Sequence, residues 1–201
     1  MKRSFSEQEI VRRESLQQLI DAGINPYPAA LFEINSTSRQ IKESYSEGET
    51  LECVIAGRIM SKRIMGKASF AEIQDKDGRI QLYINRDEIC PEEDKKMYNI
   101  VFKKLLDIGD IVGIKGEVFV TKVGEISVKV KEIKLLTKSL QPLPLPKQDS
   151  EGKVHDSFTD PEKRYRQRYV DLIVNPHVKE TFIKRTELVN SMRSYLNKKG
   201  Y

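Results

Sequence analysis

The chain has 201 residues and a net charge of +5, with 38% hydrophobic and 32% charged residues, as in a charge-rich globular protein. It contains neither an apolar run near the roughly 20 residues of a membrane span nor a secretory signal, so we expect no membrane and a cytoplasmic location. The histidines and cysteines are isolated in sequence, which predicts no metal site, with one buried and one surface thiol at Cys53 and Cys90. The basic excess is compatible with nucleic acid but does not establish it.

Residues 1–50 are expected to form a helix and an extended lead-in. Ser6 and Glu9 have the spacing of a capping box, and Gly23 is placed to end the helix. Helical spacing places five apolar residues on one face of this helix: Ile10, Val11, Leu16, Leu19 and Ile20. This face is expected to pack on the β-barrel that the following residues predict. A solvated basic face, with contacts to RNA phosphates as the alternative, is expected for Lys2, Arg3, Arg12 and Arg13.

From Leu51 apolar and polar residues alternate, as in a half-buried strand, and Gly57 interrupts this strand where a small barrel coils sharply. Residues 61–67 are expected to form a basic connection to a second strand at residues 68–75. In this strand Phe70 occupies the same set of alternate positions as the polar residues, so its side chain points to the same face as theirs. The only aromatic side chain of this strand is therefore predicted to face solvent.

Asp77-Gly78 predicts a two-residue hairpin turn into the third strand. Gln81 and Tyr83 then lie on the same outer surface as Phe70. In this register Gln81 faces Gln74, roughly 13 Å along the strand from Phe70. A slip of two residues would change that distance without changing the face.

A helix is expected from Pro91, with an acidic first turn at residues 92–94 and Gly109 as its end, and we expect it to plug the barrel. Residues 112–120 and 126–130 predict the last two strands, with Glu125 facing outward. Five strands with a helix before the fourth is the order of an oligonucleotide-binding barrel, which we assign to residues 51–139. The predicted fold is thus mainly β with flanking helices.

The outer surface of this barrel has groups suited to RNA. Stacking of a base on Phe70 could contribute about 1–3 kcal/mol without choosing among bases. Gln81 and Glu125 are suited to base edges, since uracil offers an N3–H donor between two carbonyls, and Arg63 and Lys67 could hold phosphates or carbonyls. The alternative is that the N-terminal helix covers Phe70 and that these polar residues are ordinary surface. No catalytic group of residues is present.

Alternating prolines predict a stiff linker at residues 140–158. In residues 159–201, Arg164, Arg166 and Arg168 are interpreted as a solvated basic face. A long helix follows from about residue 178 to residue 199, with a broad apolar face. Because this face has no partner within the chain, we expect the 201 residues to be part of a longer protein.

Several segments resemble class II lysyl-tRNA synthetases. Two of them are similar to the anticodon-binding barrel of these enzymes: AGRIMSKRIMGKASF at residues 56–70 and GRIQLY at residues 78–83. YRQRYVDLI at residues 165–173 resembles the start of the catalytic domain, and residues 185–201 resemble the helix of motif 1. The resemblance favours the lysine enzyme over its aspartyl and asparaginyl relatives, and it makes residues 159–201 a truncated α/β catalytic segment.

The resemblance implies that Phe70 stacks on the central uridine of the anticodon and that Gln81 bonds this base. It further implies that Glu125 reads the flanking uridines and that Arg63 supports the site. It implies tRNA-Lys as partner, with ATP and Mg²⁺ as cofactors and a homodimer for the whole enzyme. Since motifs 2 and 3 lie outside the 201 residues, we expect this chain to bind tRNA without catalysis. The alternative is a stand-alone single-stranded nucleic-acid-binding protein, or an aspartyl or asparaginyl synthetase.

Overall fold

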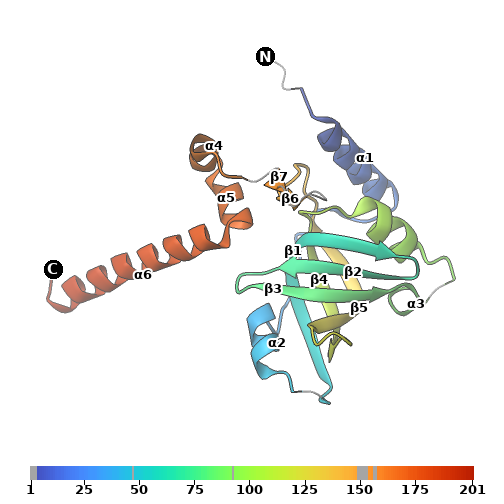
Figure 1. Ribbon diagram of the computed structural model, residues 1–201, viewed down its shortest axis with the longest axis horizontal. Coiled ribbons are helices and arrows are strands. Elements are labelled where there is room, and N and C mark those ends of the chain that lie inside the picture. The colour runs from blue at the N-terminus through green and yellow to red at the C-terminus, as the bar shows by residue number, and fades with distance from the viewer. Residues whose placement is uncertain (1–3, 47, 92, 149–153, 156–157) are drawn as a thin grey trace. The chain divides into compact units, whose positions relative to one another are not determined.

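The computed structural model describes residues 4–46, 48–91, 93–148, 154–155 and 158–201 (Figure 1). The chain divides into two compact units, Met1–Pro142 and Leu143–Tyr201. Within the described residues no helix has the length and apolar character to cross a membrane.

The first unit contains a closed five-stranded barrel (Figure 1), which confirms the predicted fold class. Its strands are β1 (Leu51–Met65), β2 (Ala68–Gln74), β3 (Arg79–Asn85), β4 (Ile111–Val120) and β5 (Ile126–Thr137). They are ordered β1-β2-β3-β5-β4 around the barrel. All neighbours are antiparallel except β3 and β5, which pair in parallel and close the ring.

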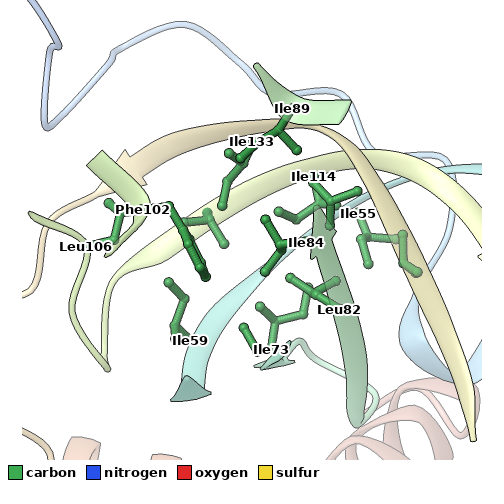
Figure 2. Close-up of a cluster of buried hydrophobic side chains, with 14 of the residues drawn as sticks. Ile55, Ile59, Ile73, Leu82, Ile84, Ile89, Phe102, Leu106, Ile114 and Ile133 are labelled. Carbon is green, nitrogen blue, oxygen red and sulfur yellow. The ribbon is translucent and has the colours of Figure 1, made fainter. Parts of the chain in front are cut away.

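Inward-pointing aliphatic side chains from all five strands fill the barrel (Figure 2). The alternating burial of β2 and β3 produces this core, because every second side chain of a strand points to the same face. Cys53 belongs to it, and burial raises the pKa of its thiol to about 11. Cys90 is also buried and its Sγ accepts a hydrogen bond from the Tyr98 amide, so the predicted surface thiol is wrong.

Two glycines allow close approach to the barrel backbone. A Cβ at Gly57 would lie 2.9 Å from the carbonyl oxygen of Gln74, on the neighbouring strand β2. A Cβ at Gly113 would lie 2.6 Å from the ring of Phe32, which belongs to the lead-in before β1. The first contact agrees with the predicted sharp coiling at Gly57, and the second lets an aromatic ring cover β4.

Both hairpins at β2 differ from prediction. Strand β1 continues to Met65, with a bulge between Ile59 and Ser61, so most of the predicted basic connection is strand. The β2–β3 loop has four residues, because the Asp75 carboxylate accepts hydrogen bonds from the amides of Asp77 and Gly78, both at 2.8 Å. Gln81 therefore faces Glu72 instead of Gln74.

The connection from β3 to β4 holds the short helix α3 (Arg86–Ile89) and the π-helix η1 (Met97–Leu105). The predicted start at Pro91 is wrong: Asp94 lies in a turn and accepts a hydrogen bond from the Lys96 amide, and Glu92 lies outside the described residues. Helix η1 does contribute Tyr98, Phe102 and Leu105 to the core of the barrel, as expected of a plug.

Helix α1 (Glu7–Asp21) begins with the predicted capping box, and Gly23 follows it with φ +75°. Its packing face was predicted in part: Leu19 is fully buried in the barrel core, whereas Ile10, Val11 and Ile20 are 46–56% exposed. The helix also packs through polar contacts, because the buried Arg12 guanidinium donates to the carbonyls of Ile108 and Ser139, at 2.8 and 3.1 Å. These contacts also exclude Arg12 from the predicted solvated face; Lys2 and Arg3 lie outside the described residues.

Arg12 is part of a buried polar network, which we call the Asp110 cluster: Arg12, Asp107, Asp110, Lys138 and Ser139. The fully buried Lys138 ammonium donates to Asp110 at 2.8 Å, to Asp107 at 2.5 Å and to the Leu105 carbonyl at 2.8 Å. Asp110, also fully buried, accepts from the amides of Asp107 and Ser139, each at 2.7 Å. In the described residues no buried side-chain nitrogen or oxygen lacks a partner.

A second helix in the lead-in, α2 (Ser38–Ser44), has no counterpart in the sequence-based prediction. It begins with a capping box between Thr37 and Gln40 and places Ile41 in the barrel core. Ser38 donates to the Asp75 carboxylate through its amide, at 2.5 Å, and its hydroxyl, at 2.7 Å. Helix α2 is thereby fixed to the β2–β3 loop.

The second unit holds the strand pair β6 (Lys147–Gln148) and β7 (Val154–His155), then α4 (Pro161–Arg166), α5 (Arg168–Val174) and α6 (Pro176–Lys198). The solvated basic face predicted here is wrong for Arg164 and Arg168, whose guanidinium groups both donate to Asp171. Burial of Asp171 raises its pKa, but hydrogen bonds from Asn175 and Arg164 outweigh this and leave the pKa below its usual value. On α6, Leu188 and Met192 are mostly exposed.

Candidate nucleic-acid interface

A groove of about 610 Å³ lies on the outer surface of the barrel. Strands β1, β2 and β3 and the β4–β5 loop contribute its walls: Ser61, Arg63, Phe70, Ala71, Glu72, Gln81, Thr121, Val123 and Glu125. All four predicted site residues are among them. Folding thus brings together side chains that the sequence distributes over more than 60 positions.

Phe70 provides the aromatic surface of the groove. Its side chain is half-buried, and its ring centroid lies 5.4 Å from that of Tyr83, the residue opposite on β3. Tyr83 in turn contacts Phe119 edge to face, at 5.9 Å. No described residue of α1 lines the groove, so the alternative in which that helix covers Phe70 is not supported. The ring is held by neighbouring rings while it still borders open space.

Arg63 lies directly opposite Phe70 on β1. It is exposed, and within the described residues no carboxylate forms an ion pair with it. A guanidinium beside an aromatic ring can stack on a base or bind a phosphate through several parallel N–H groups. Arg63 therefore keeps its donors for a ligand.

Gln81 lies between two polar neighbours, Glu72 on β2 and Ser127 on β5. Its side-chain Nε2 donates to the Ser127 hydroxyl oxygen at 2.9 Å. Glu72 follows Phe70 by two positions and forms an ion pair with Arg79 at 3.1 Å. In the observed register Gln81 faces a residue only two positions from Phe70, roughly 7 Å along the strand. The amide and the ring are thus closer than predicted.

Glu125 sits at the end of the β4–β5 loop in a well-defined backbone. Its amide donates to the Thr121 hydroxyl at 3.1 Å, and its carbonyl accepts from the Thr121 amide at 3.0 Å. Gly124, with φ +84°, permits this tight loop. The Glu125 carboxylate is half exposed and lies 3.6 Å from the Lys42 ammonium of α2.

Sequence reasoning missed several groups around the groove. Glu72 shares the outward parity of Phe70, which is a signal that could have identified it. Val123, which is 89% exposed, lies two positions before Glu125 in the short segment between the last two predicted strands. Lys42 had no signal, because its position near Glu125 depends on how α2 packs.

The groove combines one aromatic ring, one guanidinium, one amide and two carboxylates. Carboxylate and amide oxygens accept hydrogen bonds from N–H groups at base edges, whereas two carboxylates repel phosphate. The arrangement suits an unpaired base on the ring, with backbone phosphates near the cations at the rim.

Comparison with known proteins gives a domain match within this chain and several similar proteins. Residues 53–136 match the tRNA anticodon family, described as an OB-fold nucleic acid binding domain. A lysine–tRNA ligase of Christiangramia forsetii is 61% identical over 98% of this chain and 34% of that protein. Lysine–tRNA ligases of Porphyromonas gingivalis and Azobacteroides pseudotrichonymphae are 58% and 56% identical, again over 98% of this chain. The chain spans about a third of the length of most of these relatives.

Proposed function

We propose, from its 61% and 58% identity to two lysine–tRNA ligases over 98% of its length, that the groove of this chain binds the anticodon of tRNA-Lys. Phe70 stacks on the central uridine, Gln81 hydrogen-bonds that base and Glu125 reads the flanking uridines. Arg63 supports the same site from the opposite strand. The observation that carries this proposal is the presence of these four side chains in a single groove.

The chemistry of the groove supports a preference for uridine. Stacking on Phe70 supplies affinity for any base, on the order of 1–3 kcal/mol, so the choice among bases falls to the polar groups. Glu125 can only accept hydrogen bonds while it is ionised, and it therefore favours a base with an N–H at its edge. Uracil has such a donor at N3, whereas unprotonated cytosine has an acceptor there.

For the whole protein we propose lysine–tRNA ligase activity in a cytoplasmic homodimer. Lysine is activated by ATP to lysyl-adenylate and then transferred to the 3′ end of tRNA-Lys, with Mg²⁺ as cofactor. In the described part of the chain no group of three or more His, Cys, Asp or Glu residues could hold a metal ion. We propose that ATP and Mg²⁺ are bound through motifs 2 and 3 of the class II enzymes, and we expect the 201 residues alone to show no lysine-dependent pyrophosphate exchange.

Titration of the chain with an anticodon stem-loop carrying UUU, and with one whose loop is shuffled, tests the proposal at fixed salt. We expect tighter binding to UUU and a loss of about 10- to 100-fold for Phe70→Ala, because the stacking surface is removed. Equal affinities for the two loops would instead support a non-specific single-strand binder.

Phe5→Ala is the matched control. Phe5 is an exposed phenylalanine on the N-terminal side of α1, outside the groove, and the Arg13 guanidinium lies 4.1 Å from its ring. It should leave binding of the UUU loop unchanged. An equal loss for both variants would contradict the assignment of Phe70 as the stacking residue.

A further inference from the structure

Ser127 is a buried polar residue next to the groove that the proposed function does not yet use. It is the second residue of β5, it is fully buried, and it pairs with Gln81 in the parallel ladder that closes the barrel. Its hydroxyl lies 2.9 Å from Gln81 Nε2 and 3.2 Å from the Glu125 carbonyl oxygen. One hydroxyl thus touches two of the four site residues.

The single proton of this hydroxyl determines the direction of both hydrogen bonds. The Glu125 carbonyl can only accept, so Ser127 donates its proton there. The Ser127 oxygen must then accept from Gln81, which places the amide nitrogen toward Ser127. In the reversed orientation of the amide, Ser127 would donate to Gln81 Oε1, and its oxygen would face the Glu125 carbonyl without a proton between them. Burial excludes water from relieving that contact.

The consequence for Gln81 is a fixed order of its two polar atoms. With one N–H of Nε2 engaged by Ser127, the amide presents Oε1 as an acceptor and its second N–H as a donor. This order matters because uracil has an acceptor at position 4 and a donor at N3, whereas cytosine has the reverse. A fixed amide fits one of the two edges, and the flipped amide fits the other.

We propose that Ser127 is a positioning residue that makes the groove select uridine over cytidine, because it holds the Gln81 amide in the orientation that fits uracil. This inference rests on the proposed function, in which Gln81 reads the central base of the anticodon. It adds a residue that touches no RNA and acts only through Gln81.

The test compares affinities of the 201-residue chain for stem-loops carrying UUU and UCU, at one salt concentration. The unsubstituted chain should prefer UUU by tenfold or more. Ser127→Ala frees the amide to flip, so the preference should fall about tenfold while stem-loop binding through Phe70 remains. A thermal melt of each variant verifies folding, and Ser127→Cys, with almost the same volume and a poorer acceptor, serves if the alanine variant does not fold.

Two controls separate positioning from general loss of structure. Ser69 is also fully buried and its hydroxyl bonds the Tyr98 hydroxyl at 2.7 Å, inside the barrel, so Ser69→Ala should keep the preference for UUU. In a Gln81→Ala chain, adding Ser127→Ala should change the preference no further, because Ser127 acts through the amide. A further drop would overturn the inference.

The outcomes distinguish this inference from the proposed function. If the unsubstituted chain binds UUU and UCU equally, the proposed reading of the central base by Gln81 is wrong and the inference fails with it. If the unsubstituted chain prefers UUU and Ser127→Ala prefers it equally, only the role of Ser127 is overturned.

Discussion

The groove and the Asp110 cluster are both rich in polar side chains, but they differ in where the partners come from. In the cluster, Lys138 and Asp110 are fully buried and bonded to each other and to backbone groups of the same chain. In the groove, Arg63 is exposed and Gln81 and Glu125 use only part of their hydrogen-bonding capacity within the described residues. Polar groups that the chain itself satisfies stabilise the fold, whereas those with capacity left over are available to a ligand.

The largest expected effect is on stability and comes from the cluster. Lys138→Met leaves Asp110 buried without its cation and should lower the free energy of unfolding of the barrel by about 3–5 kcal/mol, measured by urea unfolding. The preference of the folded protein for UUU should not change. The control Lys131→Met removes a half-exposed ammonium paired with Glu52 and Glu117, and it should cause a far smaller loss of stability, because solvent screens an exposed ion pair. A loss that small for Lys138→Met would show that the cluster does not hold the fold.

Arg12 tests whether a basic residue of α1 belongs to the fold or to the RNA surface. Arg12→Leu removes the charged donors to Ile108 and Ser139 and should destabilise the barrel by about 1.5–3 kcal/mol. The salt dependence of stem-loop binding should stay unchanged, since a buried guanidinium reaches no phosphate. Arg13→Leu, on the exposed side of the same helix, is the matched control for stability. A smaller salt slope for Arg12→Leu would favour the phosphate contact instead.

Arg63 is expected to behave in the opposite way. Arg63→Ala should leave the urea midpoint unchanged, because the side chain is exposed and makes no ion pair with a described residue. It should weaken binding of the UUU loop by about 1 kcal/mol and reduce the slope of log K against log salt by about 1. An unchanged slope would remove Arg63 from the interface.

The smallest expected effect is a pH dependence of stability that comes from Asp75, whose carboxylate holds Ser38 of α2. Burial raises the Asp75 pKa, but hydrogen bonds from Ser38, Asp77 and Gly78 outweigh it and hold the pKa below the ordinary 3.8. Because the folded-state pKa is the lower one, Asp75 stabilises the protein above pH 3.8 and loses this contribution as pH falls through the folded value. Asp75→Asn should be less stable than the unsubstituted chain at pH 7, and the gap should narrow below pH 3.8. A gap that is constant with pH would show that the charge is unimportant.

Local patterns were enough for much of the barrel. Alternation of apolar residues predicted the five strands and the outward direction of Phe70 and Gln81, since side-chain direction in a strand follows from parity. The capping box of α1 was equally readable, because its two hydrogen bonds join residues three apart. The strand register could not be predicted from the sequence. Asp75 stabilises a four-residue loop where a two-residue turn was expected, and Gln81 therefore pairs with Glu72 instead of Gln74 on β2.

Contacts between distant segments were beyond the reach of the sequence patterns. Arg12 is separated from Ser139 by 127 positions, and Arg164 of α4 meets Asp171 of α5 only after these two helices have packed. In each case a cation that looks solvated in the sequence is paired with an acceptor from another segment. Lys42 was missed for the same reason, since its position near Glu125 depends on how α2 packs. Helix α2 itself carries a local signal that was overlooked, the capping box between Thr37 and Gln40.

The sequence by itself determined that this protein has a five-stranded barrel with an outward aromatic ring and polar neighbours, because periodicity and turn residues act over short distances. Only the tertiary structure decided that β1, β2, β3 and the β4–β5 loop enclose one groove, and that Ser127 joins Gln81 to Glu125. Closure of the barrel through the β3–β5 pairing is the physical reason, since it places Gln81 beside a strand that begins 45 positions later.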